Sequence, residues 1–142
     1  MGIPIKRINQ KRPVIVLKTK EEYNEILKKE CEYHINLETT TYYLGFVIHS
    51  GAFLIYCFLF FIRLLTNHQP DAFDIGVCVF HIIFFVLNAI MILRIRNLYE
   101  NADFSYIKDN YQSSQWMLSS VIVNPLAFIF ARQTRSLLKE LC

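Results

Sequence analysis

The sequence predicts an all-α membrane protein with three transmembrane helices, preceded by a basic arm, a short candidate strand and a capped amphipathic surface helix. Two long stretches, 39–62 and 75–93, contain no Asp, Glu, Lys or Arg, and a third such stretch covers 110–131. At about 1.5 Å per residue, each is long enough as a helix to cross a hydrocarbon core of roughly 30 Å. Apolar residues form 54% of the chain and are gathered into these runs, whereas a soluble helical bundle would spread them at helical spacing. We therefore expect a membrane domain over 42–131, with spans at 42–65, 73–95 and 113–131.

The N-terminal arm is basic. The first twenty residues contain no Asp or Glu and carry Lys6, Arg7, Lys11, Arg12, Lys18 and Lys20. Such a segment suits anionic lipid or an acidic protein face. Nucleic acid is not an expected partner, because no aromatic side chain interleaves these basic residues before Tyr23. A basic, acid-free start without a secretory signal favours the mitochondrial inner membrane, with the endoplasmic reticulum as the alternative.

The rest of the extramembrane segment 1–41 holds two candidate elements. The apolar run 13–17 could form one strand, which has no sheet to join within the chain and would have to pair with another subunit or lie on the membrane. Thr19 to Glu22 has the pattern of a capping box, which predicts a surface helix from there to about His34. Its narrow apolar stripe, around Tyr23 and Leu27, predicts contact with a partner or with lipid headgroups.

The first two spans are expected to form a hairpin. The threonines that follow Glu38 can cap the first span, and Tyr42 and Tyr43 lie where an aromatic belt belongs. Arg63 closes this span, and the polar segment 65–71, with Pro70, predicts the turn. The second span begins beside Asp71 and Asp74 and ends at Arg94 and Arg96, as the helix dipole favours.

The third run is ambiguous between a span and a re-entrant segment. Its length favours a span over 113–131, anchored by Trp116 and kinked at Asn124-Pro125, whereas the distribution of Lys and Arg on the two sides favours two spans. We expect three spans, with a re-entrant segment as the alternative. The preceding residues 97–114 carry four aromatic side chains and are predicted to be a loop held at the interface. Residues 132–142 form an amphipathic C-terminal tail.

Polar side chains within the spans are the usual pointers to function. His49 and His81 are candidates for contact with haem or quinone, but counting residues from the span ends places them about 11 Å apart in depth, whereas two axial ligands must lie level. The same count places His49 level with Asn88 and predicts a hydrogen bond between them. Ser50, Gly51 and Ala52 predict close packing of the first span near His49.

No stretch has the spacing of a catalytic set, a phosphate loop or a metal site, and the four cysteines are not paired in a ligand pattern. The sequence therefore predicts a protein that is not an enzyme and binds no metal or cofactor. The function we expect is that of an accessory subunit of a larger membrane complex, such as a respiratory-chain or ATP-synthase assembly, with other integral membrane subunits as partners. The alternative is a redox anchor subunit that contacts haem or quinone through His49 or His81.

Overall fold

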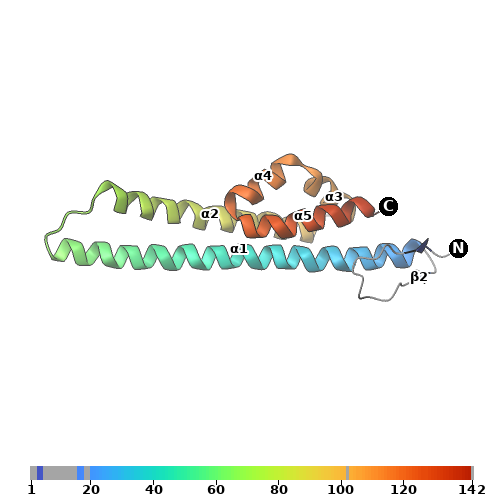
Figure 1. Cartoon of the computed structure of the whole chain (residues 1–142), viewed down its shortest axis with the longest axis horizontal. Helices are drawn as coiled ribbons and strands as arrows, with labels where there is room; N and C mark the ends of the chain where they lie inside the picture. The colour runs from blue at the N-terminus through green and yellow to red at the C-terminus, as the bar shows by residue number, and fades with distance from the viewer. Residues whose placement is uncertain (1–2, 5–15, 18–19, 102, 142) are drawn as a thin grey trace.

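The computed structural model describes residues 3–4, 16–17, 20–101 and 103–141, and these residues form a helical protein (Figure 1). The elements in chain order are β1 (Ile3–Pro4), β2 (Val16–Leu17), α1 (Lys20–Leu65), α2 (Ala72–Asn101), α3 (Phe104–Gln112), α4 (Ser114–Val123) and α5 (Pro125–Glu140). Within the described residues, α1 and α2 are the two helices long and apolar enough to cross a membrane. The predicted helical fold class is confirmed, and the predicted count of three spans is not.

The two short strands pair with each other. β1 and β2 are antiparallel, with Ile3 opposite Leu17 and Pro4 opposite Val16. The sequence prediction that the strand has no partner within the chain is therefore wrong. Its partner is a two-residue segment inside the basic arm, too short to be detected by residue alternation.

Helix α1 is continuous from Lys20 to Leu65, so the prediction of a separate surface helix ending near His34 is wrong. The threonines that we interpreted as caps lie inside the helix. The hydroxyls of Thr39, Thr40 and Thr41 each donate to the carbonyl four residues earlier, at 2.8 Å. This internal bonding satisfies the polar side chains without ending the helix. Thr19, the predicted cap, lies outside the described residues.

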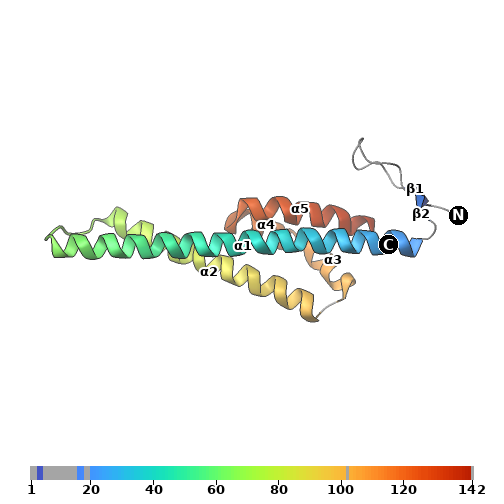
Figure 2. The ribbon, with the colours of Figure 1, turned by 90° about the horizontal axis from the view of Figure 1, so that it is seen from below.

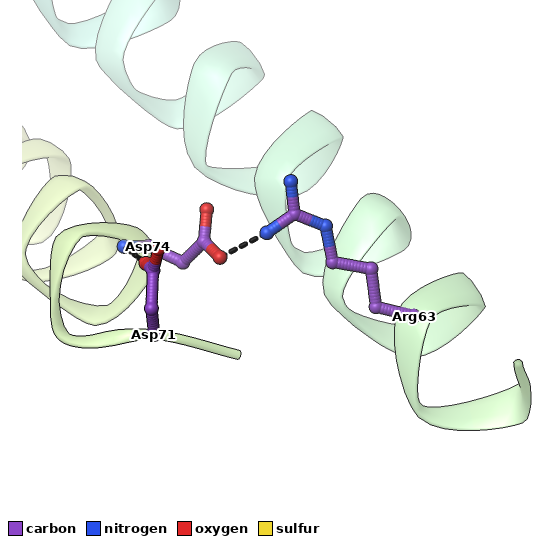
Figure 3. A network of polar contacts seen from close by, with 3 residues as sticks. All are labelled: Arg63, Asp71 and Asp74. Atoms are coloured by element: carbon purple, nitrogen blue, oxygen red, sulfur yellow. Dashed lines mark hydrogen bonds and ion pairs between the residues drawn. The ribbon is translucent and has the colours of Figure 1, made fainter. Parts of the chain in front are cut away.

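The turn between the two long helices is built from the residues that predicted it. Asn67 has a left-handed backbone with φ 55°. His68 N donates to Arg63 O at 3.0 Å and Asn67 N to Leu64 O at 3.3 Å, which together form a Schellman motif that ends α1. Asp71 then caps α2 by accepting from Asp74 N at 2.9 Å, and the Asp74 carboxylate pairs with Arg63 across the turn (Figure 3).

Most of the described residues between 97 and 114 are helical rather than a loop. α2 continues to Asn101, and α3 begins after Asp103, whose side chain accepts from Tyr106 N at 3.0 Å as an N-cap. The four aromatic residues of this segment suggested an interfacial loop, but Tyr111 is fully buried, and Tyr99 and Phe104 pack against the core. Tyr106 is exposed, so three of the four aromatic side chains serve helix packing.

The third apolar run forms two helices that fold back on each other. α4 ends at Val123 and α5 begins at Pro125, with Asn124 in an extended conformation between them. Arg135 Nη2 donates to Gln112 O at 3.2 Å, which shows that α5 returns towards the end of α3. Both figures show α5 lying beside the N-terminal half of α1 (Figures 1 and 2). Pro125 has no N–H for a continuing helix, so the chain breaks and reverses where we expected a kink.

The buried core lies in the half of the molecule that contains the chain termini. There α3, α4 and α5 cover the N-terminal part of α1 and the C-terminal part of α2 (Figure 1). The core includes Leu27, Cys31, Ile35, Tyr42, Met91, Ile95, Ile107, Tyr111, Trp116, Ala127, Ala131 and Leu138. Trp116, predicted to be an interfacial anchor, is only 3% exposed and belongs to this core. We call this half the head, and the remaining pair of helix segments, 43–65 and 72–90, the membrane hairpin.

Candidate functional site

The two histidines of the membrane hairpin lie side by side. His49 Nδ1 is 3.0 Å from His81 Nδ1, and the ring centroids are 5.3 Å apart. The ring of Tyr56, which lies about two helical turns beyond His49 on α1, stacks on His81 with the ring centroids 5.8 Å apart. His81 therefore lies between the levels of His49 and Tyr56, about one helical turn from each. Counting from assumed span ends placed His49 and His81 too far apart in depth, because the count took residues 42 and 95 to be level, whereas Asn124 contacts both Thr41 and Asn88.

The close contact limits what the histidine pair can hold. Two imidazole nitrogens on one tetrahedral metal ion, each bonded at about 2 Å, would lie about 3.3 Å apart and would both direct a lone pair at the ion rather than at each other. The observed 3.0 Å between the Nδ1 atoms instead fits a shared proton, with one imidazole donating and the other accepting. Within the described residues there is no group of three or more His, Cys, Asp or Glu side chains placed to hold a metal ion.

The predicted hydrogen bond between His49 and Asn88 is wrong. Asn88 Nδ2 donates to Phe84 O at 2.8 Å, and Asn88 Oδ1 accepts from Asn124 Nδ2 at 3.4 Å. This pair packs on Gly45, where an added Cβ would lie 2.5 Å from Asn88 Oδ1. Close helix packing therefore occurs at Gly45 and not at Gly51, since nothing in the described chain lies within 4 Å of a Cβ built on Gly51.

A second polar cluster lies in the head and was not predicted. Glu38 of α1 is fully buried, and Tyr111 of α3 donates to its Oε2 at 2.6 Å. One turn along α1, Tyr42 donates to Ser120 Oγ of α4 at 3.0 Å. The ring of Trp116 packs beside Tyr111, with centroids 5.0 Å apart. The cluster therefore joins α1, α3 and α4 at the boundary between the head and the membrane hairpin.

Burial controls the protonation of this cluster. Desolvation raises the pKa of Glu38 from 4.5 to about 8, against the opposing effect of hydrogen bonds from Tyr111 and its neighbours. Among the described residues Glu38 Oε1 has no hydrogen-bond partner, as suits a neutral carboxyl better than a carboxylate. The pKa of Tyr111 is raised well above 10, first by burial and then by Glu38. The cluster can therefore hold a proton near neutral pH, and the Arg94 guanidinium lies 5.4 Å from the centroid of the Trp116 ring.

The sequence did contain a signal for Glu38. The buried residues of α1 recur every three or four positions, as Leu27, Cys31, Ile35, Glu38 and Tyr42. This is the spacing of an amphipathic helix, and it continues through Glu38. We assigned Glu38 to the start of a new helix, and that assignment ended the stripe at His34. Cys31, on the same stripe, is a buried thiol whose pKa burial raises to about 12, which makes it unreactive.

Comparisons with protein-family models, curated proteins and solved structures give no match for this chain. Its function must therefore be argued from its own residues.

Proposed function

We propose that the chain is a non-catalytic accessory subunit of a larger membrane complex, held in the bilayer by the membrane hairpin. The observation that carries this proposal is the open space beside Gly51, in a patch of small residues on α1 formed by Ser50, Gly51 and Ala52. In membranes, small residues let helices approach closely and mark helix–helix contacts. Among the residues that the structure describes, a Cβ on Gly45 would meet Asn88, whereas a Cβ on Gly51 would meet no atom within 4 Å. A helix of another subunit fits there.

The surroundings of the patch support a partner within the bilayer. Apolar side chains project from both helices of the membrane hairpin, and several are large and more than half exposed, including Leu54, Ile55, Phe58, Phe61, Leu65, Phe73 and Ile75. Water is an unfavourable medium for so many exposed apolar groups, whereas lipid or a second membrane subunit can cover them. The basic N-terminal arm adds affinity for anionic lipid or for an acidic surface of the complex.

We infer the cellular compartment from the composition of this basic N-terminal arm. A basic, acid-free start favours the mitochondrial inner membrane, in a respiratory-chain or ATP-synthase assembly, and the endoplasmic reticulum is the alternative. Fractionation of cells producing the full chain with a C-terminal tag distinguishes the two compartments.

Partner capture tests the accessory role. The tagged full chain is purified from its native membranes in mild detergent, and the co-migrating proteins are identified. Gly51→Leu is expected to remove the partner, because it fills the open patch. Cys57→Leu, which adds a similar side chain at an exposed position of α1 outside the patch, is the matched control and is expected to retain the partner. Recovery of the unsubstituted chain as a lone monomer would contradict the proposal.

The redox-anchor alternative rests on the contact between His49 and His81 in the membrane hairpin. Because their Nδ1 atoms face each other, a haem or quinone would have to engage the other ring nitrogens, Nε2. An absorption spectrum of the purified material tests this alternative. A haem band that disappears in both His49→Ala and His81→Ala would favour the redox anchor over the accessory role.

A further inference from the structure

We propose that the α4–α5 hairpin is a re-entrant element whose outer face enters the hydrocarbon of one membrane leaflet, beside the membrane hairpin. This inference rests on the membrane placement in the proposed function and not on the accessory role. Lipid acyl chains are the neighbours that cover this outer face. Four features of the hairpin carry the inference.

The first feature is its two-sided composition. The inner face packs on α1 and includes Trp116, Ser120, Ala127 and Ala131, all buried. The outer face is apolar and exposed, with Leu118, Val121, Ile122, Leu126 and Ile129 between 40% and 62% accessible. No Asp, Glu, Lys or Arg occurs anywhere from residue 110 to residue 131. Between 116 and 131 every exposed side chain is apolar, and a short segment that is buried on one face and apolar on the other suits lipid as its second neighbour.

The second feature is the satisfaction of polar groups at the tip. A break in a helix exposes backbone groups, and in lipid these must be bonded within the protein. Asn124 Nδ2 donates to Thr41 O at 3.0 Å and to Asn88 Oδ1 at 3.4 Å, and Asn124 Oδ1 accepts from Ala127 N at 3.3 Å. Pro125 has no N–H to satisfy. The tip is thus tied to α1 and α2 through the side chain of Asn124.

The hydroxyls of α4 follow the same rule. Ser119 Oγ donates to Gln115 O at 2.8 Å, and Ser120 Oγ donates to Trp116 O at 3.0 Å. Each serine therefore bonds to its own helix, as serines in membrane helices do. The two serine hydroxyls between Trp116 and the tip therefore need no hydrogen bond to water.

The third feature is depth. The contacts of Asn124 with Thr41 and Asn88 place the tip beside Asn88, six residues or about 9 Å before Arg94, and therefore inside the charge-free part of α2. From Arg132 to Asn124 the helix rises about 12 Å, which is less than half of a hydrocarbon core of roughly 30 Å. The hairpin can therefore enter one leaflet and cannot cross the bilayer. The exposed apolar band of α1 begins at Tyr43 and Leu44, next along the helix from Thr41.

The fourth feature is the charge that borders the apolar face. Arg132 and Arg135 lie within α5, directly after its apolar part, and Arg94 and Arg96 directly follow the charge-free part of α2. Arg94, Arg96 and Arg132 are exposed, and such long side chains can reach lipid phosphates at the surface of the leaflet. Within the described residues Arg96 also pairs with Glu100, and Arg135 donates to Gln112 O.

Nitroxide accessibility tests the insertion directly. The full chain, with its cysteines replaced by alanine, carries one spin label at Ile122 or Leu126 and is reconstituted alone in vesicles of phosphatidylcholine and phosphatidylglycerol. Collision rates with oxygen, which concentrates in lipid, and with a water-soluble nickel chelate are measured. Controls are Leu54, exposed on the membrane hairpin, and Gln133, exposed just beyond the apolar face. The ratio of oxygen to nickel collisions at Ile122 and Leu126 is expected to approach the value at Leu54 and to exceed that at Gln133 several-fold.

Three outcomes would overturn the inference or its premise. High nickel accessibility at Ile122, with a lipid-type ratio at Leu54, would show that the hairpin lies in water while the membrane placement stands. Low collision rates with both reagents at Ile122 would show that protein covers the face. A water-type ratio at Leu54 would refute the membrane placement itself. If the cysteine-free chain fails to fold, Ile122→Trp in a Trp116→Phe chain that keeps its cysteines is expected to be quenched by lipids brominated on the upper acyl chain, and absence of quenching would overturn the inference.

Discussion

Glu38 is the residue whose environment departs most from its ordinary chemistry. It is a fully buried carboxyl with one hydrogen-bond donor, Tyr111, and it faces Tyr42 and Trp116, with Arg94 beyond the indole ring. Its pKa is about 8 in the folded chain and near 4.5 otherwise, so the folded state binds the proton more tightly than the unfolded state. The free energy of unfolding is therefore greatest below the ordinary pKa and falls as the pH rises towards the folded pKa.

This linkage predicts a pH dependence of stability. The midpoint of thermal unfolding in detergent is expected to fall as the pH is raised from about 5 to about 9, because the buried carboxyl must ionise. Glu38→Gln keeps the shape and an acceptor for Tyr111 but cannot ionise, so its midpoint should vary much less over that range. An equally steep pH dependence in Glu38→Gln would show that another group is responsible.

Gly45 and Gly51 are a matched pair on one helix. A Cβ on Gly45 would lie 2.5 Å from Asn88 Oδ1 and 3.0 Å from Asn124 Nδ2, two atoms that are held by hydrogen bonds, whereas a Cβ on Gly51 meets no atom of the described chain within 4 Å. Gly45→Ala is expected to lower the free energy of unfolding by about 1–3 kcal/mol, and Gly51→Ala is expected to leave it unchanged or slightly raised. Denaturant titration of both variants checks this, and equal stabilities would contradict the described packing.

At the scale of elements, α1 is the helix on which the rest of the chain is assembled. It joins the head to the membrane hairpin without a break, and its 46 residues extend for about 69 Å at 1.5 Å per residue. Such a helix transmits a displacement at one end to the other only if it is continuous through Thr39, Thr40 and Thr41.

Continuity through Thr40 is tested by proline. Thr40→Pro removes an internal N–H and clashes with the carbonyl of Asn36, and it is expected to cost about 3 kcal/mol of stability. Thr40→Ala, at the same exposed position, is expected to change the stability by less than about 0.5 kcal/mol. If a new helix began here, proline would be tolerated at its first turn. A Thr40→Pro chain with unchanged unfolding would therefore refute the continuous helix.

For the whole molecule, the number of spans determines where the ends lie. The C-terminal end of α5 is held against the N-terminal part of the head, because Tyr23 donates to Glu140 Oε2 at 3.1 Å and Lys108 Nζ donates to Leu141 O at 3.0 Å. Two spans place both ends on one side of the membrane and the turn at 66–71 on the other. Three spans would separate the ends.

Protease protection in sealed vesicles distinguishes these topologies. Tags at the N-terminal arm and after Leu141 are expected to be both cleaved or both protected, and a tag inserted at Gln69 should show the opposite behaviour. A C-terminal tag protected when the N-terminal tag is cleaved would restore the third span predicted over 113–131.

The elements that the sequence located correctly are those set by local chemistry. Charge-free runs, the polar turn with Pro70 and the acidic start of α2 were all found where the structure has them, because each depends on neighbouring residues alone. The errors have one origin. Each misassigned segment contains residues that suit two different structures, and only contacts with distant helices decide between them. These segments are Glu38–Thr41, the aromatic segment 97–114 and Asn124-Pro125.

Length and hydropathy by themselves determined that this is a helical chain with segments able to span a bilayer, but they predicted three such segments where the described residues form two helices of that kind. The tertiary structure alone decided that α1 runs unbroken, that the third run doubles back, and that His49 meets His81 while Asn88 meets Asn124. Hydropathy measures whether a residue prefers lipid or water, and it carries no information on whether a helix continues or the chain turns back. The course of the chain was decided by contacts between residues more than thirty positions apart, which no local pattern records.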